Sequence, residues 1–158
     1  MKHPVPQVGP IDDLIEATLQ RAGMRADASE PEKPRASADP ALDERLTTQL
    51  KRGVAALLDK KAEKLVVLNL QGLTTISDYF VLATAGSDRQ AQALADAVEM
   101  ALKAEGRRPL SIEGYQSAAW ILLDYGDVVF HVFHHEARRF YGLERLWGDA
   151  PDATSAFR

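Results

Sequence analysis

A helical spacing of apolar residues begins after Asp39, a good N-cap that is followed by Pro40 at the first helical position. Large apolar residues then recur on one side of the predicted helix, at Leu42, Leu46, Leu50, Val54, Leu57 and Leu58. Such a stripe is typical of a helix that packs on a core. Residues 65–70 then form a short apolar run, which predicts a buried strand.

A second strand and a second helix follow in close succession. Residues 77–85 are rich in aromatic and aliphatic side chains and predict a strand that stops at Gly86. Ser87 then serves as an N-cap, Gln90 completes a capping box, and Gly106 closes the helix. The predicted buried stripe of this helix consists of Ala91, Leu94, Ala95, Val98 and Leu102.

Three further strands are expected in the next part of the chain. Residues 109–112 should run parallel to the strand at 77–85, because a strand, helix, strand unit of this length favours a right-handed crossover. Residues 120–123 and 128–133 are apolar runs on either side of a short turn that contains a glycine. This arrangement predicts an antiparallel hairpin.

The last apolar segment, over residues 136–147, has the spacing of a short helical segment that packs back on the sheet. The element order is therefore helix, two strands, helix, three strands and helix. A single mixed β-sheet flanked by helices accounts for this order, so the predicted fold class is α/β.

One domain of ordinary size is expected from a chain of 158 residues. Residues 27–40 contain no large apolar side chain and have the composition of a linker, while residues 11–19 have the spacing of a short amphipathic helix. We therefore expect a mostly disordered N-terminal extension over residues 1–40, a folded domain over 41–149 and a polar tail over 150–158.

Composition excludes several classes of protein. The chain has no cysteine, which rules out disulfides, a thiolate nucleophile and cysteine-ligated metal sites. No apolar run is long enough for a membrane span, and the proline-containing N-terminus lacks the apolar stretch of a signal peptide, so we expect a cytoplasmic protein. A net charge of -4 argues against a broad nucleic-acid surface. The arginine pairs at 107–108 and 138–139 either touch RNA locally or are simply solvated.

The Gly86-Ser87 pair between a strand and a helix offers backbone N–H groups that can hold a phosphate. Nucleotidyltransferases use such a turn together with an Asp-x-Asp pair that binds metal ions. Here Asp88 is followed by Arg89 and Gln90, so that pair is missing. A nucleotide-binding enzyme of this fold is the alternative interpretation, and capping of the helix explains the same residues without it.

His131, His134 and His135, followed by Glu136, are residue types that bind metals. On a continuous strand, however, His131 and His135 would lie roughly 13 Å apart and His134 would face the other way. The favoured interpretation is that His131 packs or hydrogen-bonds and that the other two histidines begin a helix, with no metal and no cofactor.

No other catalytic arrangement stands out. The chain has no Gly-x-Ser-x-Gly sequence around a nucleophile. The paired carboxylates of Asp124 and Asp127 flank a predicted turn, where aspartate is favoured for conformational reasons alone. The sequence therefore predicts a binding protein rather than an enzyme.

Aromatic side chains are concentrated in the last third of the chain, at Tyr115, Trp120, Tyr125, Phe130, Phe133, Phe140, Tyr141 and Trp147. Aromatic residues are common both in cores and at interfaces, so the cluster predicts either. An exposed aromatic sheet face would also allow a homodimer when the protein is free.

The motifs between Ser77 and Trp147 resemble the Iojap family, the bacterial ribosomal silencing factors, over roughly residues 42–149. The pieces that carry the resemblance are Ser77-Asp78-Tyr79-Phe80, Gly86-Ser87 with Arg89, Glu113-Gly114, and residues 120–124, 126–133 and 138–147. The resemblance implies a mixed sheet of nucleotidyltransferase-like topology without catalytic carboxylates. It also implies a translation repressor that binds the fourteenth protein of the large ribosomal subunit and sterically blocks association with the small subunit.

Carried over residue by residue, the resemblance implies a partner-binding surface made of Trp120, Leu122, Asp124, Asp127, His131, Tyr141 and Glu144. Strand alternation places Trp120, Leu122 and Asp124 on one face of the sheet. Because a carboxylate is not expected deep in a core, we expect this face to be partly open. The alternative is that the aromatic and aliphatic members are core residues, that the two aspartates only shape the turn, and that Glu144 is solvated.

Overall fold

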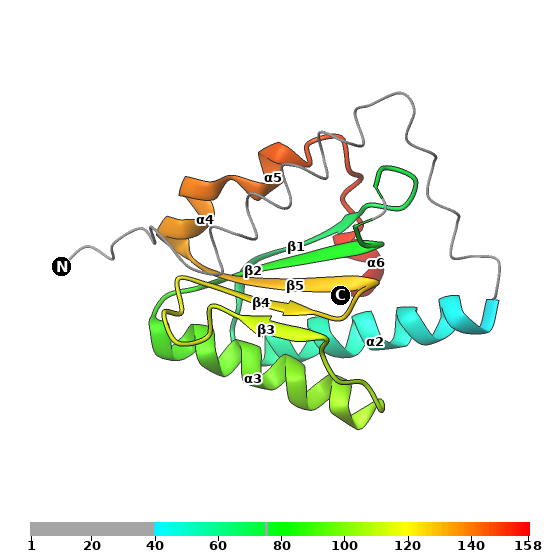
Figure 1. Cartoon of the computed structure of the whole chain (residues 1–158), viewed down its shortest axis with the longest axis horizontal. Helices are drawn as coiled ribbons and strands as arrows, with labels where there is room; N and C mark the ends of the chain where they lie inside the picture. The colour runs from blue at the N-terminus through cyan, green and yellow to red at the C-terminus, as the bar shows by residue number, and fades with distance from the viewer. Residues whose placement is uncertain (1–39, 75) are drawn as a thin grey trace.

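The computed structural model describes residues 40–74 and 76–158, which form a five-stranded sheet with helices on both faces (Figure 1). In chain order the elements are α2 (Pro40–Asp59), β1 (Glu63–Asn69), β2 (Tyr79–Ala85), α3 (Asp88–Ala104), β3 (Ser111–Glu113), β4 (Trp120–Asp124), β5 (Val128–His134), α4 (His135–Tyr141), α5 (Leu143–Leu146) and α6 (Thr154–Phe157). The predicted α/β class and order of elements are confirmed. The predicted linker and N-terminal helix lie outside the described residues.

The strand order in the sheet is β1-β2-β5-β4-β3. β2 and β5 pair in parallel, and all other neighbours are antiparallel, so the sheet is mixed. The predicted hairpin is confirmed, with Trp120 opposite Phe133 and Asp124 opposite Val129. β3 runs in the same direction as β2, as predicted, but β5 and β4 lie between them.

The two faces of the sheet are covered unequally. α2 and α3 lie against one face, while the shorter α4 and α5 lie against the other (Figure 1). Strand alternation sorts the side chains as predicted, with Ile121 and Leu123 in the core beneath α2 and α3. Trp120 and Leu122 belong to the second core, beneath α4 and α5. The predicted stripe of α3 is buried in full.

The N-terminus of α3 is capped by side chains that the sequence singles out. The Ser87 hydroxyl accepts a hydrogen bond from the Gln90 N–H at 3.0 Å, which confirms the N-cap. The Gln90 side chain reaches one residue further back than in a standard capping box, and its Oε1 accepts from the Gly86 N–H at 2.8 Å. Its amide also donates to the carbonyls of Lys60 and Lys61, so the cap is tied to the end of α2.

The predicted helical segment at 136–147 is confirmed, but it consists of two helices. Gly142 separates α4 from α5 with φ +58, a left-handed conformation that favours glycine. Its N–H donates to the carbonyl of Arg138 and so closes α4. The chain then turns, which lets α5 lie beside α4 on the same face of the sheet (Figure 1).

The predicted polar tail over residues 150–158 packs on the domain through its backbone and through Phe157. Asp152 forms a bridge to Leu68, the Ala153 N–H donates to the Val67 carbonyl, and the Thr154 hydroxyl accepts from the Val67 N–H. Phe157 in α6 is buried in the core beneath α2 and α3. The segment covers part of the outer edge of β1, which would otherwise expose unpaired backbone groups.

Gly53 in α2 lies directly against the ring of Phe130 on β5. A Cβ atom at this position would lie 2.5 Å from Cζ of Phe130, a side chain that is fully buried. We predict that Gly53→Ala destabilises the protein by about 1 to 3 kcal/mol through overpacking. This loss exceeds the gain of up to about 1 kcal/mol that alanine brings to a helix interior. Urea denaturation measures the difference.

The control for this prediction is Thr48→Ala, at an exposed position of the same helix, which should change the stability by less than about 0.5 kcal/mol. Phe130→Leu removes the part of the ring that the new Cβ would clash with. In the Phe130→Leu background, Gly53→Ala should therefore cost less stability than it does in the wild type. A Gly53→Ala protein as stable as the wild type would show that the helix can move away from β5.

Candidate functional site

The structure places the residues of the predicted partner-binding surface in two groups. Trp120, Leu122 and His131 lie on the sheet face beneath α4 and α5, and Tyr141 at the end of α4 packs on Trp120. Glu144 lies on α5 above them, whereas Asp124 and Asp127 lie at the hairpin at the far end of β4. Trp120 and Asp124 stand at the two ends of a five-residue strand, roughly 13 Å apart, and Asp127 pairs with Arg107, which also bonds Gln49 of α2 on the opposite side of the sheet.

Trp120 and His131 are joined by a buried hydrogen bond. The indole Nε1–H of Trp120 donates to Nδ1 of His131 at 3.0 Å. Since that nitrogen acts as the acceptor, the neutral imidazole carries its proton on Nε2. Within the described part of the chain, this Nε2 is buried without a hydrogen-bond partner. The bond fixes the orientation of both rings.

The expectation that the Trp120 face is partly open is wrong. Trp120 is 0% exposed, Leu122 is 3% exposed and His131 is 2% exposed. The rings of Phe133 and Tyr141 each lie with their centroids 4.9 Å from the indole of Trp120. Asp124, which suggested an open face, avoids burial because it stands at the end of the strand. Trp120, Leu122 and His131 are therefore core residues, which lie beneath the exposed surface of α4 and α5 and are not part of it.

Burial also decides the charge of His131. The side chain is enclosed by aromatic rings, with Phe80 at 4.5 Å and Phe133 at 6.0 Å between centroids. Desolvation lowers the pKa of His131 from 6.5 to about 3, because the protonated ring would lose its hydration without gaining an acceptor. His131 is therefore neutral at physiological pH and suits an aromatic core.

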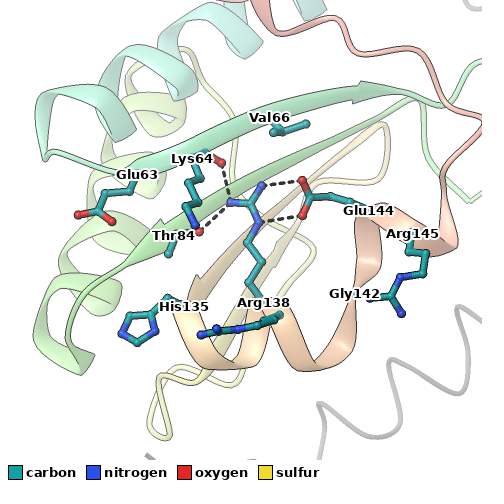
Figure 2. Close-up of a pocket in the computed structure, with 10 residues that line it drawn as sticks. Glu63, Lys64, Val66, Thr84, His135, Arg138, Gly142, Glu144 and Arg145 are labelled. Carbon is teal, nitrogen blue, oxygen red and sulfur yellow. Dashed lines mark hydrogen bonds and ion pairs between the residues drawn. The ribbon is translucent and has the colours of Figure 1, made fainter.

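Arg138 joins α4 and α5 to the edge of the sheet (Figure 2). Its side chain is 8% exposed and forms a two-pronged ion pair with Glu144, with both N–H···O distances at 3.0 Å. Nη1 also donates to the carbonyl of Lys64 at 2.5 Å and to the hydroxyl of Thr84 at 2.7 Å. One guanidinium thus links α4, α5, β1 and β2, and each of these bonds helps to offset its burial.

The same residues line a cavity of about 710 Å³ at the end of the sheet. It lies between β1, β2 and the α4–α5 pair, with Arg138 and Glu144 among its walls (Figure 2). The remaining walls are mostly polar or charged, and include Lys64, Arg139 and Arg145. A cavity of this size can hold a small ligand or part of a polymer chain.

At the hairpin, both aspartates take part in the structure. The Oδ1 of Asp124 accepts from the Gly126 N–H at 2.8 Å and so shapes the turn, as the sequence suggested. Asp127 pairs with Arg107 at 2.8 Å, and Arg107 also donates to the Tyr125 carbonyl and to Gln49. The Asp127 side chain is still 37% exposed, so its outer side can face a partner.

The arrangement offers little for covalent chemistry. The Gly86 N–H, which would have to face a phosphate at the Gly-Ser turn, already donates to Gln90. Among residues 40–74 and 76–158, no group of three or more His, Asp or Glu side chains is placed to hold a metal ion. His134 and His135 stand where β5 ends and α4 begins.

The sequence singled out Arg107 and Arg138 only as RNA contacts or solvated side chains, and it gave no sign of the bonds that they make within the domain. Arg138 and Arg107 each join elements far apart in the chain, and an arginine gives no sign in the sequence of which carbonyl or carboxylate it will meet. Phe140, beside Tyr141 on α4, is 63% exposed, although its apolar character suggested burial as readily.

The helices formed by the described residues all lack the combination of length and apolar character that a bilayer crossing requires.

Comparisons with known proteins agree on one family. Residues 43–157 match the family model described as "Ribosomal silencing factor during starvation". Ribosomal silencing factor RsfS of Halalkalibacterium halodurans is 45% identical over 102 residues, which cover 65% of this chain and 87% of the relative. The protein of the same name from Bacillus subtilis is 43% identical over 108 residues, or 68% of this chain and 92% of the relative.

Two solved crystal structures are similar to this chain in both sequence and fold. A crystal structure of a protein from Chromobacterium violaceum is similar, with a TM-score of 0.63 and 38% identity, over 64% of this chain and 84% of that chain. A second crystal structure, from Bacillus halodurans, has a TM-score of 0.58 and 41% identity, over 63% of this chain and 93% of that chain.

The buried, neutral His131 predicts how stability depends on pH. An unfolded histidine binds a proton below about pH 6.5, whereas folded His131 resists protonation until about pH 3. The unfolded state therefore binds more protons in this window, and the stability should fall as the pH drops from 6.5 towards 3. In His131→Asn, whose side-chain oxygen can still accept from Trp120, this part of the slope should vanish.

Urea midpoints measured between pH 7 and 5 test the prediction, since most carboxylates remain ionised there. His135→Asn, an exposed histidine on α4, is the matched control and should keep the wild-type slope. Equal slopes for the wild type and His131→Asn would mean that His131 gains its proton without disturbing the fold.

Proposed function

The chain belongs to the ribosomal silencing factor family, and we propose that it represses translation by binding the large ribosomal subunit. The proposed contact is the fourteenth protein of that subunit, on the surface that meets the small subunit. Occupying this surface blocks association of the two subunits. The observation that carries the proposal is the family match over residues 43–157, which includes every element from β1 to α6.

The names of the relatives support a regulatory role rather than an enzymatic one. The Gly-Ser turn is consistent with this role, because its backbone and its serine serve to cap α3. A factor of this kind needs no chemical step. It needs a rigid body, a surface that recognises one partner, and enough bulk to keep a second partner away.

Steric exclusion follows from the size of the domain. A folded domain of this length has a radius of gyration of about 13 Å, so it spans far more than the few ångströms that separate contacting surfaces. Once bound at the subunit face, the protein therefore prevents close approach without any conformational change of its own.

The proposed contact surface lies on α4 and α5. Phe140 is 63% exposed, and its ring stands edge-on to Tyr141 at 5.0 Å between centroids. Tyr141, in turn, lies 4.9 Å from the buried indole of Trp120. Because these rings hold Phe140 in place, its side chain loses little conformational entropy on binding. Aromatic side chains with such support commonly contribute most of the binding energy of an interface.

The other members of the predicted surface fit around this centre. Glu144 is 45% exposed on its outer side while its oxygens hold Arg138. Asp124 and Asp127 lie at the hairpin beyond β4, where the 37% exposed carboxylate of Asp127 gives the proposed interface an acidic edge. Trp120, Leu122 and His131 contribute by keeping the aromatic residues above them in place.

We predict that the purified protein cosediments with isolated large subunits and lowers the yield of joined ribosomes when the small subunit is added. Sucrose-gradient sedimentation measures both effects. A protein unfolded beforehand should do neither. Cosedimentation with the small subunit alone, or full joining at saturating protein, would contradict the proposal.

We also predict that Phe140→Ala weakens binding to the large subunit by about 2 kcal/mol, a loss of roughly thirtyfold in affinity. Because the side chain is largely exposed, the urea midpoint should hardly change. Met100→Ala is the matched control, since Met100 is 74% exposed but lies on α3, against the opposite face of the sheet. Wild-type affinity of the Phe140→Ala protein would remove α4 from the contact surface.

A further inference from the structure

The cavity beside Arg138 concentrates positive charge in a protein that is acidic as a whole. Its walls carry the side chains of Lys64, Arg138, Arg139 and Arg145, opposed by Glu63 and Glu144. The cavity thus has an excess of positive charge, whereas the chain has a net charge of -4. His135 lies at one side of the cavity and Arg145 at the other (Figure 2).

Some of the charged side chains that line the cavity already form ion pairs within the protein, and others do not. Arg138 and Glu144 neutralise one another in their two-pronged ion pair, 3.0 Å apart. Lys64, Arg139 and Arg145 form no side-chain hydrogen bond or ion pair with other residues of the described chain. Glu63 is the one carboxylate of the cavity outside the Arg138 pair, so three cationic groups outnumber it.

The backbone holds this cluster in position. Lys64 has φ +50 and lies where the register between β1 and β2 shifts, so its carbonyl turns to Arg138. α4 then places Arg138 inside and the adjacent Arg139 outside. Gly142, with φ +58, has the guanidinium of Arg145 next to its Cα, and a Cβ there would lie 3.3 Å from Nη2. Three local features thus converge on one cavity.

We propose that this cavity binds a backbone phosphate of RNA at the edge of the surface that contacts the large subunit. Guanidinium groups match phosphate oxygens in two-pronged hydrogen bonds, and a buried, fixed Arg138 gives the cavity a rigid wall. The inference rests on the proposed function for its partner, because a ribosomal surface presents phosphates close to its proteins. It adds a second contact to the aromatic one on the neighbouring side of α4.

The proposed contact is local. The low overall charge excludes a broad electrostatic footprint, so one or two phosphates are engaged. Neutralising each phosphate of a single strand changes the slope of log affinity against log salt by roughly 0.7. Salt dependence therefore reports the number of contacts directly, which a loss of affinity alone does not.

The test uses the full chain and the double variant Arg139→Ala/Arg145→Ala. The control is Arg45→Ala/Lys51→Ala, which removes the same charge from exposed positions of α2 on the opposite face of the sheet. In the first arm, fluorescence anisotropy follows a labelled twelve-nucleotide RNA at about 50 mM KCl, where phosphate contacts are weakly screened. We expect the cavity variant to bind roughly fivefold more weakly than the wild type, and the control to bind within about twofold.

The second arm measures affinity for large subunits at several KCl concentrations. The cavity variant should lose roughly one unit of salt slope and the control none. Equal losses in both variants, or no RNA binding by the wild type, would overturn the inference. The wild type could bind RNA through the cavity and yet fail to bind the large subunit. That result would contradict the proposed function and support the phosphate site. Thermal melting confirms that both variants remain folded.

Discussion

The strand β5 is buried along its whole length, and this burial on both faces is the constraint on which the rest of the structure depends. Residues such as Phe130 and Val132 need a cover on one side, and His131 and Phe133 need one on the other. α2 and α3 supply the first cover with long apolar stripes, and α6 adds Phe157. The second cover is made of α4 and α5, which are too short to be stable alone in water.

The second cover holds because polar and apolar contacts reinforce one another. Ala137, Leu143 and Trp147 pack on the sheet, while Arg138 joins the helices to the edge strands through Glu144, Thr84 and the Lys64 carbonyl. A buried guanidinium costs desolvation energy unless its donors are satisfied, so Arg138 favours the one arrangement of the helices in which it keeps these bonds. Gly142 supplies the turn that lets Glu144 reach back to Arg138.

This thin cover is also where the surfaces proposed for function gather. Its outward side carries Phe140, supported by Tyr141 and the Trp120–His131 pair, and its other side closes the basic cavity. The sheet face beneath is buried, and it fixes the rings of the proposed contact surface. The proposed mechanism of steric exclusion benefits from such rigidity, because ordering a mobile Phe140 on binding would reduce the affinity for the partner.

The sequence by itself determined the local structure and the family. The apolar stripe of α3, the Ser87 cap and the hairpin at residues 124–127 depend on neighbours in the chain, so periodicity and turn chemistry predicted them. Only the tertiary structure decided that Trp120 is buried, that Phe140 is exposed, and that Phe157 packs into the core. It also decided the partners of Arg138. Burial and long-range pairing depend on which elements come together across the sheet, and no local pattern contains that information.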